Sequence, residues 1–189
     1  GAYNALAMKD IKKLVAYSSI SHMGFVLLGI AAFNVEGWQG AIFQLVSHGI
    51  LSSMLFLMAG VLYSRTGNRD IDSYSGLASK MPIFTLISGI AIFASLGLPG
   101  FSGFIGEFFS LMGAFTSPIL IPIYSVIGAL GILLGAGYLL WTFQKVFLGK
   151  PYTLNANWSM SDLTLTETLS LYSLGVISIV LGIFPNQLF

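Results

Sequence analysis

The sequence predicts an all-α polytopic membrane protein with about five transmembrane crossings, one of them a discontinuous helix. Of its 189 residues, 56% are hydrophobic and only 8% are charged, whereas an average soluble domain has about 25% charged residues. A soluble domain of this length would not have enough polar surface to cover such an apolar core. The composition therefore excludes a soluble globular domain, a disordered chain and a nucleic-acid binder.

Net charge and cysteine content exclude further classes of function. Eight Lys and Arg against seven Asp and Glu give a net charge of +1, which indicates no polyanionic partner. The chain has no cysteine, so thiolate zinc sites, cysteine-bound iron–sulfur clusters, disulfides and cysteine nucleophiles are excluded. No motif predicts a metal or cofactor site in this chain.

Uncharged runs predict the individual helices, because a membrane-spanning helix needs about 20 apolar residues to cross about 30 Å of hydrocarbon. The expected helices are 14–33, 38–63, 81–97 followed by 103–117, 121–148 and 166–185. We treat 1–189 as a single membrane domain. Residues 1–8 form a short apolar run without the basic start of a signal peptide, so we expect the tail of a helix and a fragment of a longer protein.

The third apolar stretch, residues 81–118, is too long for one straight crossing, because about 36 helical residues would measure about 54 Å. Its central segment, residues 97–103, reads GLPGFSG, which has too many glycines, and a proline, to stay helical. The hinge residues that we expect are Gly97, Pro99, Gly100 and Gly103. The stretch is then either two crossings or one crossing made of two half-helices.

The distribution of basic residues favours one broken crossing. All eight lie in three places: Lys9, Lys12 and Lys13; Arg65, Arg69 and Lys80; Lys145 and Lys150. A single crossing puts all eight on one side, whereas two crossings split them six against two. Because cytoplasmic loops concentrate Lys and Arg, we expect the N-terminal end in the cytoplasm and the C-terminus outside.

Three titratable residues lie within the expected helices, and all three are predicted near the middle of the bilayer. Each is ten residues, or about 15 Å, from a residue that marks a membrane boundary. The pairs are His22 with Lys12, His48 with Trp38, and Glu107 with Ser117. A charge at this depth costs about 2.5–3.5 kcal/mol on insertion scales, and histidine titrates near neutral pH. Together these residues indicate a hydrophilic proton path.

Structural roles are the alternative for each of these residues. A lone histidine can hydrogen-bond between helices, Glu107 can be a protonated packing residue, and a glycine–proline kink can serve packing alone. Lys12 is either a boundary anchor or a side chain that reaches inward to the path. The candidate proton-translocation residues are thus Glu107, His48, His22 and Lys12.

Three segments of the chain closely resemble the antiporter-like subunits of respiratory complex I. They are DIKKLVAYSSISHMG at residues 10–24, QLVSHG at residues 44–49, and LGLPGFSGFIGEF at residues 96–108. The M-type branch of NADH–quinone oxidoreductase subunits, called chain 4 in mitochondria, is the most similar. Its broken helix carries glutamate, as Glu107 does here, whereas the L- and N-type relatives carry lysine.

The resemblance implies an antiporter-like repeat that translocates protons while quinone is reduced elsewhere in the complex. In that family the acid at Glu107 is an exit-side proton carrier, His48 a central relay, and His22 part of the chain between half-channels. The subunit would be a non-redox part of a translocase, with FMN, iron–sulfur clusters and quinone in other subunits. Expected partners are the other membrane-arm subunits, including the L- and N-type ones, in a bacterial inner membrane, a mitochondrial inner membrane or a thylakoid.

Several other functions remain open from the sequence. The same motifs occur in the D-type component of multi-subunit Na⁺/H⁺ antiporters, in membrane subunits of membrane-bound hydrogenases and in plastid-type NADH-dehydrogenase-like complexes. The family's other acid–base pair, in an earlier five-helix repeat, has no counterpart in this sequence. A different class of function also stays open. In it the subunit serves lipid packing or assembly, and the titratable residues near the middle of the bilayer transfer no protons.

Overall fold

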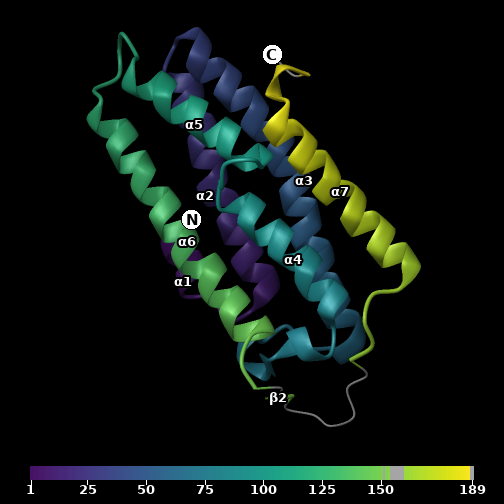
Figure 1. Cartoon of the computed structure of the whole chain (residues 1–189). Helices are drawn as coiled ribbons and strands as arrows, with labels where there is room; N and C mark the ends of the chain where they lie inside the picture. Colours follow the sequence, from purple (N-terminus) through teal and green to yellow (C-terminus); the bar gives the residue numbers. More distant parts are fainter. Residues whose placement is uncertain (151, 154–159, 188–189) are drawn as a thin grey trace.

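The computed structural model (Figure 1) describes residues 1–150, 152–153 and 160–187, and it is mostly helical. Within these residues the seven α-helices are α1 Ala2–Leu6, α2 Ile11–Ala31, α3 Val35–Thr66, α4 Pro82–Ser95, α5 Ser102–Phe115, α6 Ile123–Phe147 and α7 Leu165–Ile183. Two short strands, β1 Tyr74–Ser75 and β2 Tyr152–Thr153, pair antiparallel beneath one end of the helices. No pattern in the sequence predicted this strand pair.

The helices run back and forth along one direction (Figure 1). Helices α2, α3, α6 and α7 are each long and apolar enough to cross a membrane. Helices α4 and α5 have only 14 residues each, but they follow one another in the same direction and together make the fifth crossing (Figure 1). The predicted class, an all-α membrane protein with one broken helix, is confirmed.

Capping side chains set where the first two long helices begin. Helix α2 starts at Ile11, before the expected residue 14, because the Asp10 carboxylate accepts hydrogen bonds from Lys12 N and Lys13 N. Helix α3 starts at Val35 because the Asn34 side chain accepts from Gly37 N. These oxygens satisfy amide groups that have no partner inside the helix.

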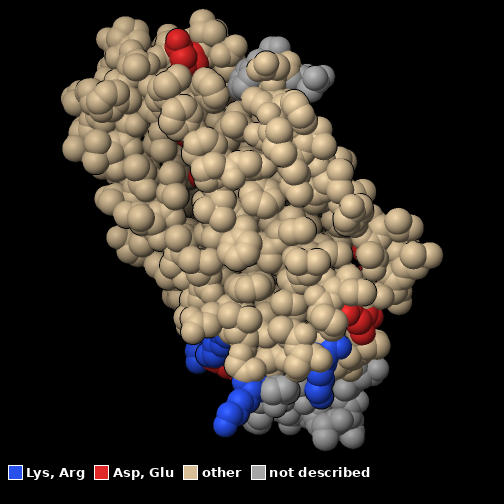
Figure 2. Space-filling model, viewed as in Figure 1, with Lys and Arg blue, Asp and Glu red and all other residues tan. Residues whose placement is uncertain are grey.

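The basic residues gather at one end of the molecule, as the sequence predicted (Figure 2). There Asp72 pairs with Lys145, and its second oxygen lies 3.3 Å from Lys9 Nζ. The hydrogen bond from Lys145, and then that from Lys9, hold the pKa of the Asp72 carboxyl below its ordinary value. The Lys145 ammonium also lies 4.9 Å from the centre of the Trp141 ring.

A second group of charges at this end joins three helices. The Arg65 guanidinium donates to both carboxylate oxygens of Glu167, at 3.0 and 2.8 Å. It also donates to the carbonyls of Ser161 and Asp162 at 2.8 and 3.1 Å. The Asp162 carboxylate in turn accepts from the first amides of α4, at 2.9 and 3.0 Å. We call Arg65, Glu167 and Asp162 the Arg65 clamp, because it ties α3, α4 and the start of α7 together.

Helices α3 and α5 pack with their backbones in direct contact. A Cβ atom added at Gly40 of α3 would collide with the backbone at Ser110 of α5, and one at Gly113 of α5 would collide with Gly37. Small residues allow such close approach between membrane helices. The close packing fixes α5, and the side chains that it carries, against α3.

Candidate functional site

The connection between α4 and α5 has the geometry of a tight turn. Phe101 N donates to Leu98 O at 3.2 Å, with Pro99 and then Gly100, whose φ is +98°, between them. Proline followed by a residue of positive φ is the signature of a type II turn. Gly97 also has a positive φ, +67°. Gly97, Pro99 and Gly100 therefore lie in the break, whereas the fourth expected hinge residue, Gly103, lies within α5 and packs against Ala94 O.

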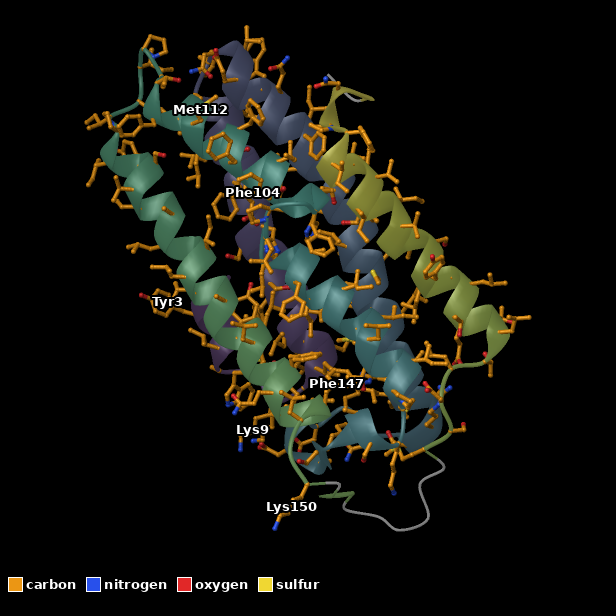
Figure 3. The ribbon with its side chains drawn as sticks, in the orientation of Figure 1. Tyr3, Lys9, Phe104, Met112, Phe147 and Lys150 are labelled. Carbon is orange, nitrogen blue, oxygen red and sulfur yellow. The ribbon has the colours of Figure 1, made fainter. Side chains whose placement is uncertain are left out.

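Glu107 lies in the second turn of α5, and its side chain returns to the break. It is 4% exposed, and a Cβ atom added at Gly97 would lie 2.5 Å from its Oε2 atom. Glycine at position 97 leaves room for the carboxyl there, and a side chain would have to displace it. Figure 3 shows Phe104, which precedes Glu107 on α5, far from the basic-end residues Lys9 and Lys150 and nearer to Met112.

His22 of α2 is 7% exposed and contacts both halves of the broken crossing. Its Nε2 atom lies 3.2 Å from Ser95 O, the last carbonyl of α4, and 3.7 Å from Glu107 Oε1. Both neighbours are hydrogen-bond acceptors, and the carbonyl end of a helix carries partial negative charge. With the proton on Nε2, the ring donates to the carbonyl, and the carboxylate oxygen is the next acceptor, at 3.7 Å.

His48 of α3 completes the group. Its ring centroid is 5.4 Å from that of His22. A cavity of about 10 Å³ is lined by both histidines, Glu107, Gln44, Ser52 and Ser95 among others, and has room for about one water molecule. The depth argument from the sequence placed the three titratable groups at one level, and the structure brings them together from α2, α3 and α5.

Lys12 lies outside this group. It belongs to the first turn of α2 at the basic end, is exposed, and lines a different cavity together with Phe56, Tyr63 and Arg69. At about 1.5 Å per residue, ten residues of helix separate it from His22. In this structure its position is that of a boundary residue.

Tyr138 of α6 is a polar residue of this region that the sequence reasoning missed. It is 1% exposed, and its hydroxyl makes no hydrogen bond of normal geometry with any described residue. Its hydroxyl lies near the Ser18 side chain of α2. The depth argument could have found it, because Tyr138 lies ten residues before Leu148, the C-cap of α6.

Two other buried polar atoms near the group lack hydrogen-bond partners among the described residues. His22 Nδ1 and Gln44 Oε1 make no hydrogen bond with a described residue. Among the residues that the structure describes, no group of three or more His, Asp and Glu could hold a metal ion. The site thus gathers titratable side chains inside a low-dielectric interior. The break in the helix also frees backbone polar groups there, which must face protein or water.

Residues 1–134 match the family of NADH:quinone oxidoreductase and Mrp antiporter transmembrane subunits. The chain is 46% identical to NADH-quinone oxidoreductase subunit M of Rickettsia felis, over 97% of this chain and 36% of the relative. It is 40% identical to F(420)H(2) dehydrogenase subunit M of Methanosarcina mazei, over 97% of this chain and 36% of that protein. The chain thus spans about a third of the length of these curated relatives.

The fold is also similar to that of a solved respiratory complex. A chain of respiratory complex I from Thermus thermophilus matches with a TM-score of 0.90 and 35% identity, over 99% of this chain and 38% of that one. The match covers the broken crossing and all four continuous helices. The family match, the relatives and this structure agree, and the chain belongs to the NADH:quinone oxidoreductase/Mrp antiporter transmembrane family.

Proposed function

We propose that this chain holds a proton-transfer centre of an M-type antiporter-like subunit of NADH–quinone oxidoreductase. Glu107 is the carrier that takes up and releases the proton, His22 is its exchange partner, and His48 is the relay on the far side of His22. The observation that carries the proposal is the 3.7 Å approach of His22 Nε2 to Glu107 Oε1 at a broken helix, with His48 packed against the His22 ring.

The geometry supports exchange of a proton within this group. Nε2 of His22 lies between a fixed acceptor, Ser95 O, and a second acceptor, Glu107 Oε1. Moving one charge across about 150 mV costs about 3.5 kcal/mol. A change of a few pKa units in the relative proton affinities of the sites is enough to drive that step.

In this proposal the redox chemistry belongs to other subunits. FMN, iron–sulfur clusters and quinone would bind there, and this chain would be a non-redox member of the translocase. Its partners are the other membrane-arm subunits, including the L- and N-type ones, in a bacterial inner membrane. The relatives from Rickettsia and Rhodobacter support the bacterial assignment.

A second candidate function differs from the first in the electron donor of the complex. The Methanosarcina relative is a subunit of an F(420)H(2) dehydrogenase, and its 40% identity is close to that of the NADH-linked relatives. The second candidate is therefore the same proton-transfer role in a complex with another electron donor. Co-purification of the assembled complex and a comparison of the donors it oxidises separate the two.

The decisive test is Glu107→Gln in the full-length subunit of the assembled complex, reconstituted into vesicles. The amide keeps the shape of the side chain but cannot ionise, so we expect redox-driven proton transfer to fall by at least about 100-fold, the lower end of what a positioned proton-transfer group contributes. Glu107→Asp should retain part of the activity. The matched control is Glu36→Gln, which removes an exposed acid in the first turn of α3 and should leave pumping unchanged.

The amount of assembled complex must be equal in all samples. If the Glu107→Gln complex pumps the wild-type number of protons per electron, Glu107 is not a carrier and the proposal is wrong. A loss of pumping in the Glu36→Gln control would also contradict it, because the effect would then not be specific to the buried centre.

A further inference from the structure

We propose that α7 sets the position of the half-helix that carries Glu107, and that Ser178 of α7 is a positioning residue for that carboxyl. The inference rests on the proposed function, and it assigns a role to a helix in which no proton-carrying residue was expected. It is carried by a chain of buried hydroxyl groups and by the contact between α7 and the break.

Three serines from three helices form this chain. Ser47 Oγ of α3 donates to Ser102 Oγ of α5 at 2.8 Å, and Ser102 Oγ shares a hydrogen bond with Ser178 Oγ of α7 at 2.9 Å. All three residues are fully buried, with 0% exposure. Hydrogen bonds in such a low-dielectric interior are stronger than at a surface, and a hydroxyl left without its partner is costly.

The chain acts at the start of the half-helix. Ser102 is the first residue of α5, and the preceding residue, Phe101, gives the helix no side-chain cap. The side chain of Ser102 is thus anchored to neighbouring helices at the point where α5 leaves the break. Since α5 has no continuous helix before it, this anchor fixes where the half-helix begins.

Helix α7 touches the break a second time, one turn further along. A Cβ atom added at Gly182 would lie 2.5 Å from Gly100 O and 2.5 Å from Phe101 Cα. Residues four apart share a face of a helix, so Ser178 and Gly182 act together. One face of α7 therefore holds the turn at Gly100 and the first residue of α5.

Glu107 depends on this position because it has little room. Its Oε2 atom packs against Gly97 on one side, and its Oε1 atom is 3.7 Å from His22 on the other. Functional groups must be held within about 0.5 Å of the productive geometry, so a small displacement of α5 changes both contacts. Ser47 also precedes His48, and the same chain thus links the two helices that carry these proton-transfer groups.

The test compares Ser178→Ala with Ser170→Ala in the full-length subunit of the reconstituted complex. Both variants remove one hydroxyl from α7, but Ser170 is exposed and donates only within its own helix, to Thr166 O. We expect Ser178→Ala to lower proton transfer between about twofold and tenfold, the factor that one hydrogen bond is worth. We also expect the pH of half-maximal pumping to shift by about half a unit, or about threefold in proton affinity. Ser170→Ala should match the wild type in both measurements.

A double-mutant comparison gives the second measurement. If the Ser102–Ser178 bond carries the effect, Ser102→Ala combined with Ser178→Ala should shift the pH profile no further than Ser102→Ala alone, because coupled residues are not additive. Additive shifts overturn the inference. So does a Ser178→Ala complex that is less abundant but pumps with the wild-type pH profile, since that is the signature of a purely structural residue.

The outcomes separate this inference from the proposed function. If Glu107→Gln stops pumping and Ser178→Ala leaves the profile unchanged, only the positioning role of α7 is wrong. If Glu107→Gln pumps normally, the carrier role itself is wrong, whatever Ser178→Ala does.

Discussion

The Arg65 clamp and the His22–Glu107 pair both join a cationic or protonatable group to a carboxylate from another helix, but they are built differently. The Arg65 guanidinium makes two hydrogen bonds to Glu167 and further bonds to three carbonyl oxygens. His22 makes one contact of hydrogen-bond length, to Ser95 O, stays 3.7 Å from Glu107, and leaves Nδ1 without a bond to any described residue.

The difference shows which pair holds the fold and which can change its partners. Arg65 has little to gain from any movement, because its donors already meet acceptors at 2.8–3.2 Å. His22, in contrast, has two acceptors near one nitrogen, at 3.2 and 3.7 Å, and its other nitrogen makes no hydrogen bond with a described residue. Buried polar groups with unused hydrogen-bonding capacity are rare and need an explanation, and the proposed proton transfer would provide one here.

The largest expected effect on stability comes from breaking the clamp. Arg65→Met should lower the free energy of unfolding by about 3 kcal/mol, at the lower end for a buried ion pair, because Glu167 remains partly exposed and would be left unpaired. Thermal unfolding of the purified subunit measures it. The control is Arg69→Met, which removes a guanidinium lying 4.4 Å from the Tyr63 ring centre and should cost about 0.5–1 kcal/mol. Equal losses in the two variants would contradict the special role of the clamp.

A substitution in the group of His22, His48 and Glu107 should have a different effect. It should reduce proton transfer while leaving the stability of the fold nearly unchanged. His48→Ala should slow coupled proton transfer by about tenfold, or about 1.4 kcal/mol of barrier, because a relay next to a cavity can be replaced in part by water. Assembly of the complex should stay close to wild type. If the complex is lost while the remaining molecules pump normally, His48 is a packing residue.

Two buried tyrosines allow a finer comparison, between a hydroxyl that makes hydrogen bonds and one that makes none with a described residue. Tyr74 at the basic end donates to Asn68 O at 2.8 Å and contacts Thr66 Oγ1 at 2.6 Å, whereas Tyr138 makes no bond of normal geometry with a described residue. Tyr74→Phe should cost about 1 kcal/mol of stability, while Tyr138→Phe should be neutral or slightly stabilising. Thermal unfolding of both variants gives the answer, and a larger loss at Tyr138 would show that its hydroxyl is satisfied after all.

The smallest effect is expected from the exposed ion pairs of Asp72. Because Lys145 holds the pKa of Asp72 below its ordinary value of 3.8, the pair stabilises the folded state above that pH and loses its effect as the pH falls below it. The difference in thermal midpoint between wild type and Lys145→Gln should therefore be small at neutral pH and shrink further as the pH falls below 3.8. A difference that persists in acid would come from the packing of Lys145 on Trp141 instead.

Much of this architecture follows from sequence patterns that act locally. Uncharged runs of sufficient length mark the crossings, and the glycines and proline of residues 97–103 mark the break. A helix rises by a constant amount per residue. Residues that are each ten positions from a membrane boundary therefore share one depth, as predicted for His22, His48 and Glu107. Helix starts are harder to place from these runs, because an Asp or Asn cap such as Asp10 shifts a helix by up to one turn.

What could not be predicted depends on how the helices face one another. The depth of His22 follows from its position in the chain, but its contact with Ser95 O depends on the rotation of α2 against α4. The serine chain joins residues 47, 102 and 178, which are far apart in sequence, and each serine alone is typical of any packed membrane helix. Tyr138 was missed because an aromatic residue in an apolar helix is expected from composition alone, although its depth matches that of the other three groups.

The contact between Gly97 and the Glu107 carboxyl has a consequence for sequence variation. A Cβ atom at position 97 would lie 2.5 Å from Glu107 Oε2, so a side chain there would push the carboxyl aside, in addition to the strain that the positive φ of +67° imposes on any residue but glycine. A homologous chain with alanine at the first position should carry a shorter acid, or a side chain that leaves the break, at the second. An engineered Gly97→Ala variant should accordingly lose less proton transfer together with Glu107→Asp than alone, while the backbone strain of the positive φ remains in both variants.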